Sequence, residues 1–153
     1  GAIGSLLAIM NTASEVGYGN VIAMLPGFES IANALLGIQI GGTPLVSMAV
    51  TVTTLAGITG SASGGLSIAL DLMAKDWLAW ANAIGMSPAV LHRVAAMASG
   101  GMDSMPHNGV VITLLAICGL THKQSYPDIF ALVLIKTTAA FLIIAVYMMT
   151  GLV

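Results

Sequence analysis

Hydrophobic positions run almost without interruption along this 153-residue chain, and the polar positions gather in a few short blocks. The longest apolar run, residues 129–149, contains a single charge, Lys136. At 1.5 Å per residue it gives about 30 Å of helix, which matches the hydrocarbon core of a bilayer. The pattern therefore predicts a final transmembrane helix within residues 127–153. Lys136 either snorkels toward an interface, the commoner arrangement, or faces protein.

Two shorter apolar segments flank the polar stretch "ASGGMDSMPHNG". Residues 87–98 begin with Ser87 as a plausible N-cap and Pro88 at the first helical position. Residues 109–120 give only about 18 Å of helix, so neither segment crosses a bilayer alone. We therefore expect residues 87–120 to form one helix that is broken in its middle.

A second interruption, "TGSASGG" at residues 59–65, separates two apolar arms of about 15 residues each. Each arm reaches the middle of a bilayer without crossing it, which favours a re-entrant hairpin over two spans. Residues 43–86 are predicted to form this hairpin and an interfacial segment. The side chains that give the far end the character of a headgroup region are Lys75, Asp76, Trp77 and Trp80.

Residues 1–42 repeat the same alternation of apolar and polar positions. A polar block at residues 11–20, which includes Glu15, lies between two apolar segments. We expect another broken helix here, followed by a connector. The chain starts at Gly1 without a basic segment or a cleavage site, so we expect a cut inside a longer polypeptide rather than a signal peptide.

The composition agrees with a membrane protein and excludes a nucleic-acid-binding one. Hydrophobic residues make up 58% of the chain, charged residues 7%, and the mean hydropathy is +1.00. An ordinary soluble domain carries roughly 25% charged residues. The net charge is -2 and the sequence contains no run of basic residues, so the chain lacks the positive patch with which proteins bind DNA or RNA.

Helix breaks at bilayer depth are tolerated only where they are buried in protein or line a water-filled cavity. Each break exposes N–H groups at one helix end and C=O groups at the other, which suit an anion and a cation respectively. Residues 59–65 suit the anion, because small residues let amides come close and Ser61 and Ser63 add hydroxyls. The alternative is that these small residues only permit tight helix packing.

Asp103 is the strongest single candidate for a functional residue. A carboxylate inside a membrane is energetically costly and rarely occurs without a partner or a function. Together with His107 it can carry a coupling proton; alternatively, the two residues brace the break. Glu15 has the same two interpretations. No metal site or cofactor is expected, because the histidines have no ligand-rich neighbours. The three histidines are His92, His107 and His122.

The segments "NTASEVGYGNVIAMLPGF" and "ASGGMDSMPHNGVVITLLAICGLTHKQSYPDIF" resemble the C-terminal part of the gluconate permease (GntP) family of proton symporters, within the ion-transporter superfamily. The resemblance covers essentially the whole chain. It implies an all-α membrane protein with two inverted repeats, each holding a re-entrant hairpin and a broken helix, in an elevator-type transporter. This chain looks like most of the second repeat. The implied setting is a multi-pass homodimer in the inner (plasma) membrane, with the first repeat supplied by the same protein.

The resemblance also implies that the hairpin tip and the broken link bind a small hydroxy-carboxylate such as gluconate, glycerate or 3-hydroxybutyrate. The candidate substrate-binding residues are Thr59, Ser61, Ser63, Gly64, Gly65, Ser104, His107 and Asn108. The candidate proton-coupling residues are Asp103, His107 and Glu15.

Three alternatives to a proton symporter remain open on the sequence. Sodium can replace the proton, because carbonyl oxygens at helix breaks hold cations. A structural membrane subunit without transport of its own is the second alternative. The third is an intramembrane hydrolase using Ser104, His107 and either Asp103 or Glu15. Three such residues within five positions seldom converge as a catalytic triad, so we expect no enzyme.

Overall fold

The computed structural model describes residues 2–38 and 40–151, without the side chains of some residues in the first two helices. These residues are all-helical and contain no strand, which confirms the helical class of the fold. The helices are α1 (Ala2–Ala23), α2 (Pro26–Leu36), α3 (Pro44–Thr59), α4 (Ala62–Ala83), α5 (Pro88–Ser99), α6 (Gly109–Cys118) and α7 (His122–Thr150).

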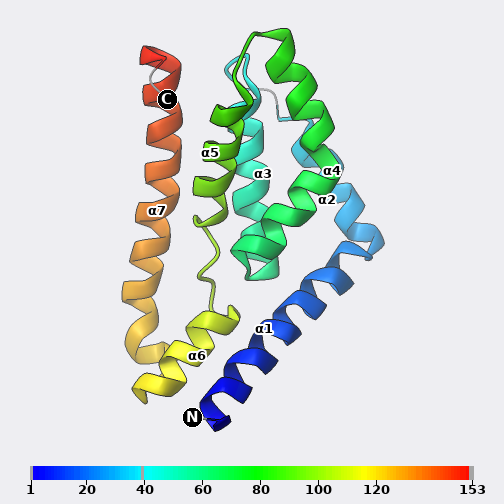
Figure 1. The fold of residues 1–153 in the computed structure, drawn as a ribbon. Coiled ribbons are helices and arrows are strands. Elements are labelled where there is room, and N and C mark those ends of the chain that lie inside the picture. The colour runs from blue at the N-terminus through cyan, green and yellow to red at the C-terminus, as the bar shows by residue number, and fades with distance from the viewer. Residues whose placement is uncertain (1, 39, 152–153) are drawn as a thin grey trace.

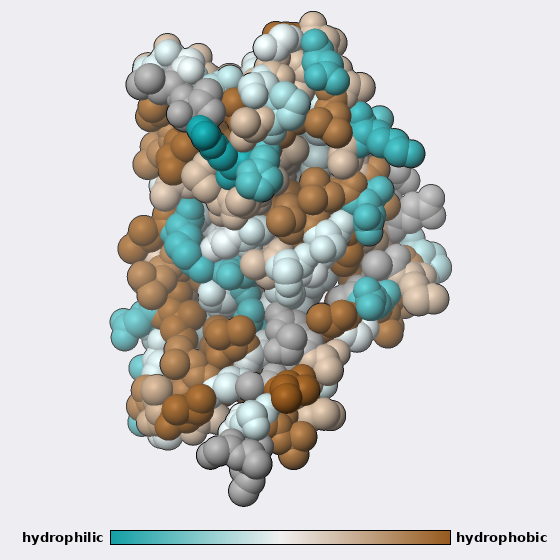
Figure 2. Space-filling model, viewed as in Figure 1, coloured by the Kyte–Doolittle hydropathy of each residue, from teal (hydrophilic) through white to brown (hydrophobic). Residues whose placement is uncertain are grey.

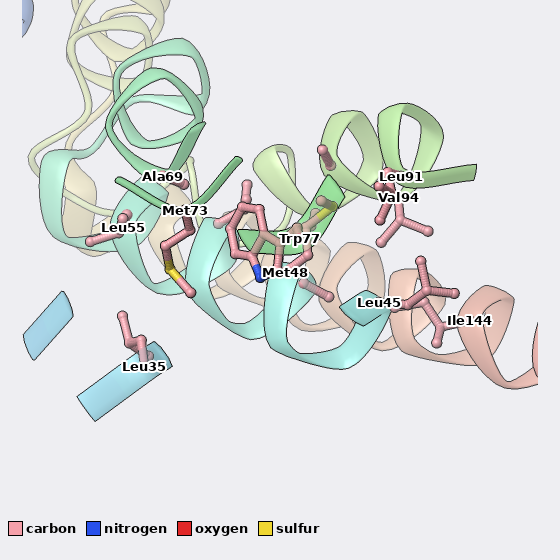
Figure 3. Close-up of a cluster of buried hydrophobic side chains, with 14 of the residues drawn as sticks. Leu35, Leu45, Met48, Leu55, Ala69, Met73, Trp77, Leu91, Val94 and Ile144 are labelled. Carbon is pink, nitrogen blue, oxygen red and sulfur yellow. The ribbon is translucent and has the colours of Figure 1, made fainter. Parts of the chain in front are cut away.

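Helix α3 is the centre of the molecule. It lies between α4 and α5, with α7 along the side of α5 and with α1 and α6 at the opposite end from the C-terminus (Figure 1). Its side chains Leu45, Met48 and Leu55 are buried against α4, α5 and α7 (Figure 3). The hairpin and the first half of the broken helix therefore form one packed unit.

The turn between α3 and α4 is built from small residues for two reasons. Gly60 ends α3 with a φ of 66°, a left-handed conformation that favours glycine. On α4, a Cβ added at Gly65 would overlap the backbone of Ala56, so the two helices pack backbone to backbone. Gly65 thus faces α3, and at this position the small residue serves close packing.

The break expected in the polar block 11–20 is not present. Helix α1 is continuous from Ala2 to Ala23, and the chain turns only before Pro26, the first residue of α2. An isolated glycine inside a helix costs only about 1 kcal/mol, and this block contains no proline. Polar composition by itself therefore does not break a helix.

Trp77 was expected at a headgroup interface, and this prediction is wrong. Its side chain is 2% exposed, and its Nε1–H donates to Ser47 Oγ on α3 at 3.3 Å. Ala69, Met73, Trp77 and Ala81 follow one another at four-residue intervals along α4 and are all buried. Trp77 belongs to this packing stripe, which turns its indole toward α3.

Helix α7 is long and apolar enough to cross a membrane, and it is the one helix with both properties in the part of the chain that the structure describes. Most of its surface is not covered by the rest of the chain, as 17% of its most apolar window is buried. Hydrophobic residues cover much of the face in Figure 2, including the edge formed by α7. Hydrophilic residues gather on this face where the segment between α5 and α6 runs beside α7.

Replacing two buried threonines of α3 by valine is expected to have opposite effects on stability. Thr53 donates its hydroxyl to Ala98 O at 3.0 Å, whereas the hydroxyl of Thr51 is fully buried and has no partner among the described residues. We expect Thr51→Val to stabilise the fold and Thr53→Val to destabilise it, each by about 1 kcal/mol. Thermal unfolding in detergent measures both, and equal destabilisation by the two variants would contradict this assignment.

Candidate functional site

The tip of the α3–α4 hairpin contacts the link between α5 and α6, residues 100–108. The contact is made by Asn108, which is 6% exposed. Its Nδ2 donates to Gly60 O at 2.6 Å and to Asp103 O at 2.8 Å. The Asn108 side chain therefore joins the link to the end of α3 and also bonds to Asp103 within the link.

The same side chain also caps the helix that follows. Asn108 Oδ1 accepts the backbone N–H of Val111 at 2.9 Å, the usual contact of an asparagine N-cap. Ser61 makes the equivalent contact at the start of α4, accepting the N–H of Gly64 at 3.1 Å. The N-terminus of α4, after the tip, and that of α6, after the link, are thus each capped by a polar residue of the predicted site.

His107 lies against the end of α3. Its Nε2 is 3.2 Å from Ile58 O, and its ring occupies the space that a Cβ on Gly60 would need. The ring of Tyr18 on α1 stands edge-on to the imidazole, with 6.2 Å between centroids. The last carbonyls of α3, on Ile58 and Gly60, therefore already accept hydrogen bonds from His107 and Asn108.

The starts of α4 and α6 leave donors free. The first-turn N–H groups of Ala62, Ser63, Gly109 and Val110 have no hydrogen-bond partner among the described residues. Because Asn108 holds Gly60 at 2.6 Å, the two helix starts lie close together. Two positive helix ends and the exposed Ser63 hydroxyl suit an anion such as a carboxylate.

An ion pair completes this region. Lys136 Nζ on α7 lies 2.8 Å from Asp103 Oδ1 and 3.2 Å from Ser104 Oγ. Ser104 donates its hydroxyl to the same carboxylate oxygen at 2.9 Å. The charged end of Lys136 therefore contacts protein. Lys136 was not among the predicted site residues, although a lone charge in an apolar run is a signal of a functional residue.

Comparison with known proteins gives one informative relative. A curated protein of Bacillus subtilis (strain 168), named uncharacterized transporter YxjC, is 58% identical to this chain over 150 residues. That protein is a transporter by name. The match covers 98% of this chain, and the chain spans about a third (31%) of the length of that relative. No family model matches the chain, and no solved structure matches it.

The structure does not bring all the predicted residues together. Asp103 pairs with Lys136, and His107 points to Ile58 O, so these two candidate proton carriers make no contact. Ser104 and Asp103 are hydrogen-bonded without an imidazole between them, which is not the arrangement of a Ser–His–Asp triad. The side chain of Glu15 lies outside the described residues.

The remaining predicted residues surround the tip. Thr59 is buried and donates to Leu55 O at 2.8 Å, so its hydroxyl is already used within α3. Ser61 Oγ and Ser63 Oγ are 3.3 Å apart, and Ser63 is exposed. Gly64 follows them in the first turn of α4. Among the described side chains, no group of three His, Cys, Asp or Glu residues is placed to hold a metal ion.

Proposed function

We propose that this chain is the substrate-binding part of a longer secondary transporter for small hydroxy-carboxylates, coupled to protons. The observation that carries the proposal is the hydrogen bond from Asn108 to Gly60 O, which holds the start of α6 beside the hairpin tip, where α4 begins. Similarity to the Bacillus subtilis transporter over 98% of the chain supports a transport role. The long apolar helix α7 supports a membrane location.

The substrate carboxylate is proposed to lie between the starts of α4 and α6. There it accepts hydrogen bonds from the N–H groups of Ser63 and Gly109, and Ser63 Oγ adds a hydroxyl donor. Substrate hydroxyls bind to side chains of the link, including Ser104. In an elevator cycle, the hairpin and α5, the first half of the broken helix, move together, because α3 packs against both α4 and α5.

Protons are favoured over sodium as the coupling ion. Sodium needs several oxygen ligands, but the terminal carbonyls of Ile58 and Gly60 already accept hydrogen bonds. Asp103, in contrast, offers a carboxylate that is 24% exposed at the link. The homodimer and the inverted first repeat remain predictions of the resemblance.

Uptake by the full-length transporter in proteoliposomes tests the proposal. We expect a pH step, acidic outside and without sodium, to drive accumulation of radiolabelled gluconate, glycerate or 3-hydroxybutyrate. Uptake that requires sodium and ignores pH would refute proton coupling. If none of the three acids is taken up under either gradient, the chain is better explained as part of a structural membrane subunit.

A further inference from the structure

Lys136 and Asp103 together make the empty site electrically neutral. The lysine is the single charge in the apolar run 129–149, and its Nζ is 2.8 Å from Asp103 Oδ1. A charged group at bilayer depth is costly, and a charge that loses its partner there is costlier still. A carrier that crosses the membrane both empty and loaded therefore needs balanced charges in both states. A monovalent carboxylate adds one negative charge, so one positive charge has to enter with it.

We propose that a substrate oxygen replaces Asp103 as the partner of Lys136 beside Ser104, and that Asp103 then binds one proton. The inference rests on the proposed transport function and identifies the residue that couples it. The Lys136 ammonium transfers its hydrogen bond from the Asp103 carboxylate to a substrate oxygen. A proton taken from water forms an O–H bond on Asp103, which becomes a neutral acid. Release of substrate and proton on the other side restores the original pair.

The geometry around Asp103 suits this exchange. Both contacts to its carboxylate, from Lys136 and from Ser104, are made to Oδ1. Oδ2 accepts no hydrogen bond from any described residue, so it is free to take the proton. The Lys136 side chain is 41% exposed and that of Asp103 24%, so the described residues do not enclose either group. An ion pair inside a closed core would not exchange partners in this way.

The link connects the ion pair to the substrate site. Asn108 donates both to the backbone carbonyl of Asp103, at 2.8 Å, and to Gly60 O at the tip, at 2.6 Å. When Asp103 leaves Lys136, the segment that Asn108 holds is the one that moves. Occupation of the tip and protonation of Asp103 are therefore connected through a single side chain.

The other titratable groups packed around the link contact groups other than the Asp103 carboxylate. His107 contacts Ile58 O, His122 contacts Pro106 O at 2.9 Å, and the Tyr126 hydroxyl contacts Met105 Sδ at 3.9 Å. Helix α3 contains no titratable residue, and those of α5, His92 and Arg93, lie in the middle of that helix, at least seven residues before the link. From α1, Tyr18 faces His107. Lys136 is the one charged group that contacts Asp103 among the described side chains.

Uptake of gluconate by the full-length transporter under separate pH and voltage gradients tests the exchange. For the wild type we expect one proton per gluconate, with uptake driven by the pH gradient and unchanged by membrane potential. Asp103→Asn cannot bind the proton, so its uptake should ignore the pH gradient and be accelerated several-fold by an inside-positive potential. Lys136→Gln should lose at least nine-tenths of uptake, and Lys136→Arg should restore most of it.

Two control variants test whether the loss of any lysine on α7, or a loss of fold, explains the loss of uptake. Lys123→Gln, on the same helix, should behave as the wild type, because it removes a lysine outside the pair. Asp103→Asn with Lys136→Gln removes both charges, so it should keep the wild-type elution profile in detergent while lacking uptake. This separates a lost function from a lost fold.

The outcomes distinguish the inference from the proposed function. Wild-type uptake that responds to membrane potential would overturn the one-for-one exchange without help from any variant. So would an Asp103→Asn variant that folds normally and either keeps its pH-driven accumulation or transports under neither gradient. Absence of binding and uptake of gluconate, glycerate and 3-hydroxybutyrate alike in the wild type would overturn the proposed function itself, and the exchange with it.

Discussion

Gly60→Ala is expected to weaken gluconate binding by the full-length transporter at least about tenfold, equivalent to roughly 1.4 kcal/mol. Gly60 has a φ of 66°, and the added Cβ would lie 2.6 Å from Cδ2 of His107 and 2.8 Å from its Nε2. The imidazole must move, which removes its contact with Ile58 O and disturbs the end of α3 next to the site. Equilibrium binding of radiolabelled gluconate measures the effect.

Gly119→Ala is the matched control for this variant. Gly119 ends α6 with φ 66° and ψ 27°, almost the same conformation as Gly60, which has φ 66° and ψ 24°. No atom lies within 4 Å of the Cβ that the substitution would add. Both variants therefore carry the same backbone strain, roughly 1–2 kcal/mol, and only Gly60→Ala displaces His107. Equal losses of gluconate affinity would contradict a role for the His107 contact.

Asn108→Ala should have the larger effect and weaken gluconate binding roughly 100-fold. It removes the hydrogen bonds to Gly60 O and Asp103 O and the cap on Val111, and each contributes about 1 kcal/mol. Without these bonds the start of α6 loses its direct hydrogen bond to the hairpin tip. Binding and thermal stability of the full-length transporter should be measured on the same sample.

Asn108→Asp removes the hydrogen bond to Gly60 O but keeps the N-cap of α6, so it tests the two contacts separately. The carboxylate still accepts the N–H of Val111, but it donates nothing to Gly60 O, which lies 2.6 Å from the original amide nitrogen. We expect Asn108→Asp to bind gluconate as weakly as Asn108→Ala and to lose thermal stability as well, because its buried carboxylate faces two carbonyl oxygens. Asn82→Ala, an exposed asparagine near the end of α4, should match the wild type in both. Wild-type affinity in Asn108→Asp would contradict a role for the hydrogen bond to Gly60 O.

Local signals predicted the helices that surround the site. Ser87 and Pro88 were expected to start a helix, and Ser87 does accept the N–H of Ala89 at 3.3 Å as its N-cap. Glycine and proline at 100–108 mark the segment between α5 and α6. These features act through the backbone of their own residues, so they can be recognised without knowledge of the fold.

Features set by distant partners were not predictable in the same way. The partner of Lys136 lies 33 residues earlier in the chain, and a single charge in an apolar run does not reveal it. Trp77 was assigned by residue type to an interface, although its four-residue spacing from Met73 and Ala81 places it on the buried face of α4. Asp103 and His107 make no contact with each other, because each binds a group outside the link.

The structure of the full-length transporter with gluconate bound, determined by electron cryomicroscopy, tests the central claim most directly. The account predicts density for the carboxylate within hydrogen-bond distance of the first-turn N–H groups of α4 and α6, beside Ser63 and Asn108. Gluconate density elsewhere in the protein, with the tip and link still joined through Asn108 and no ligand between them, would contradict it.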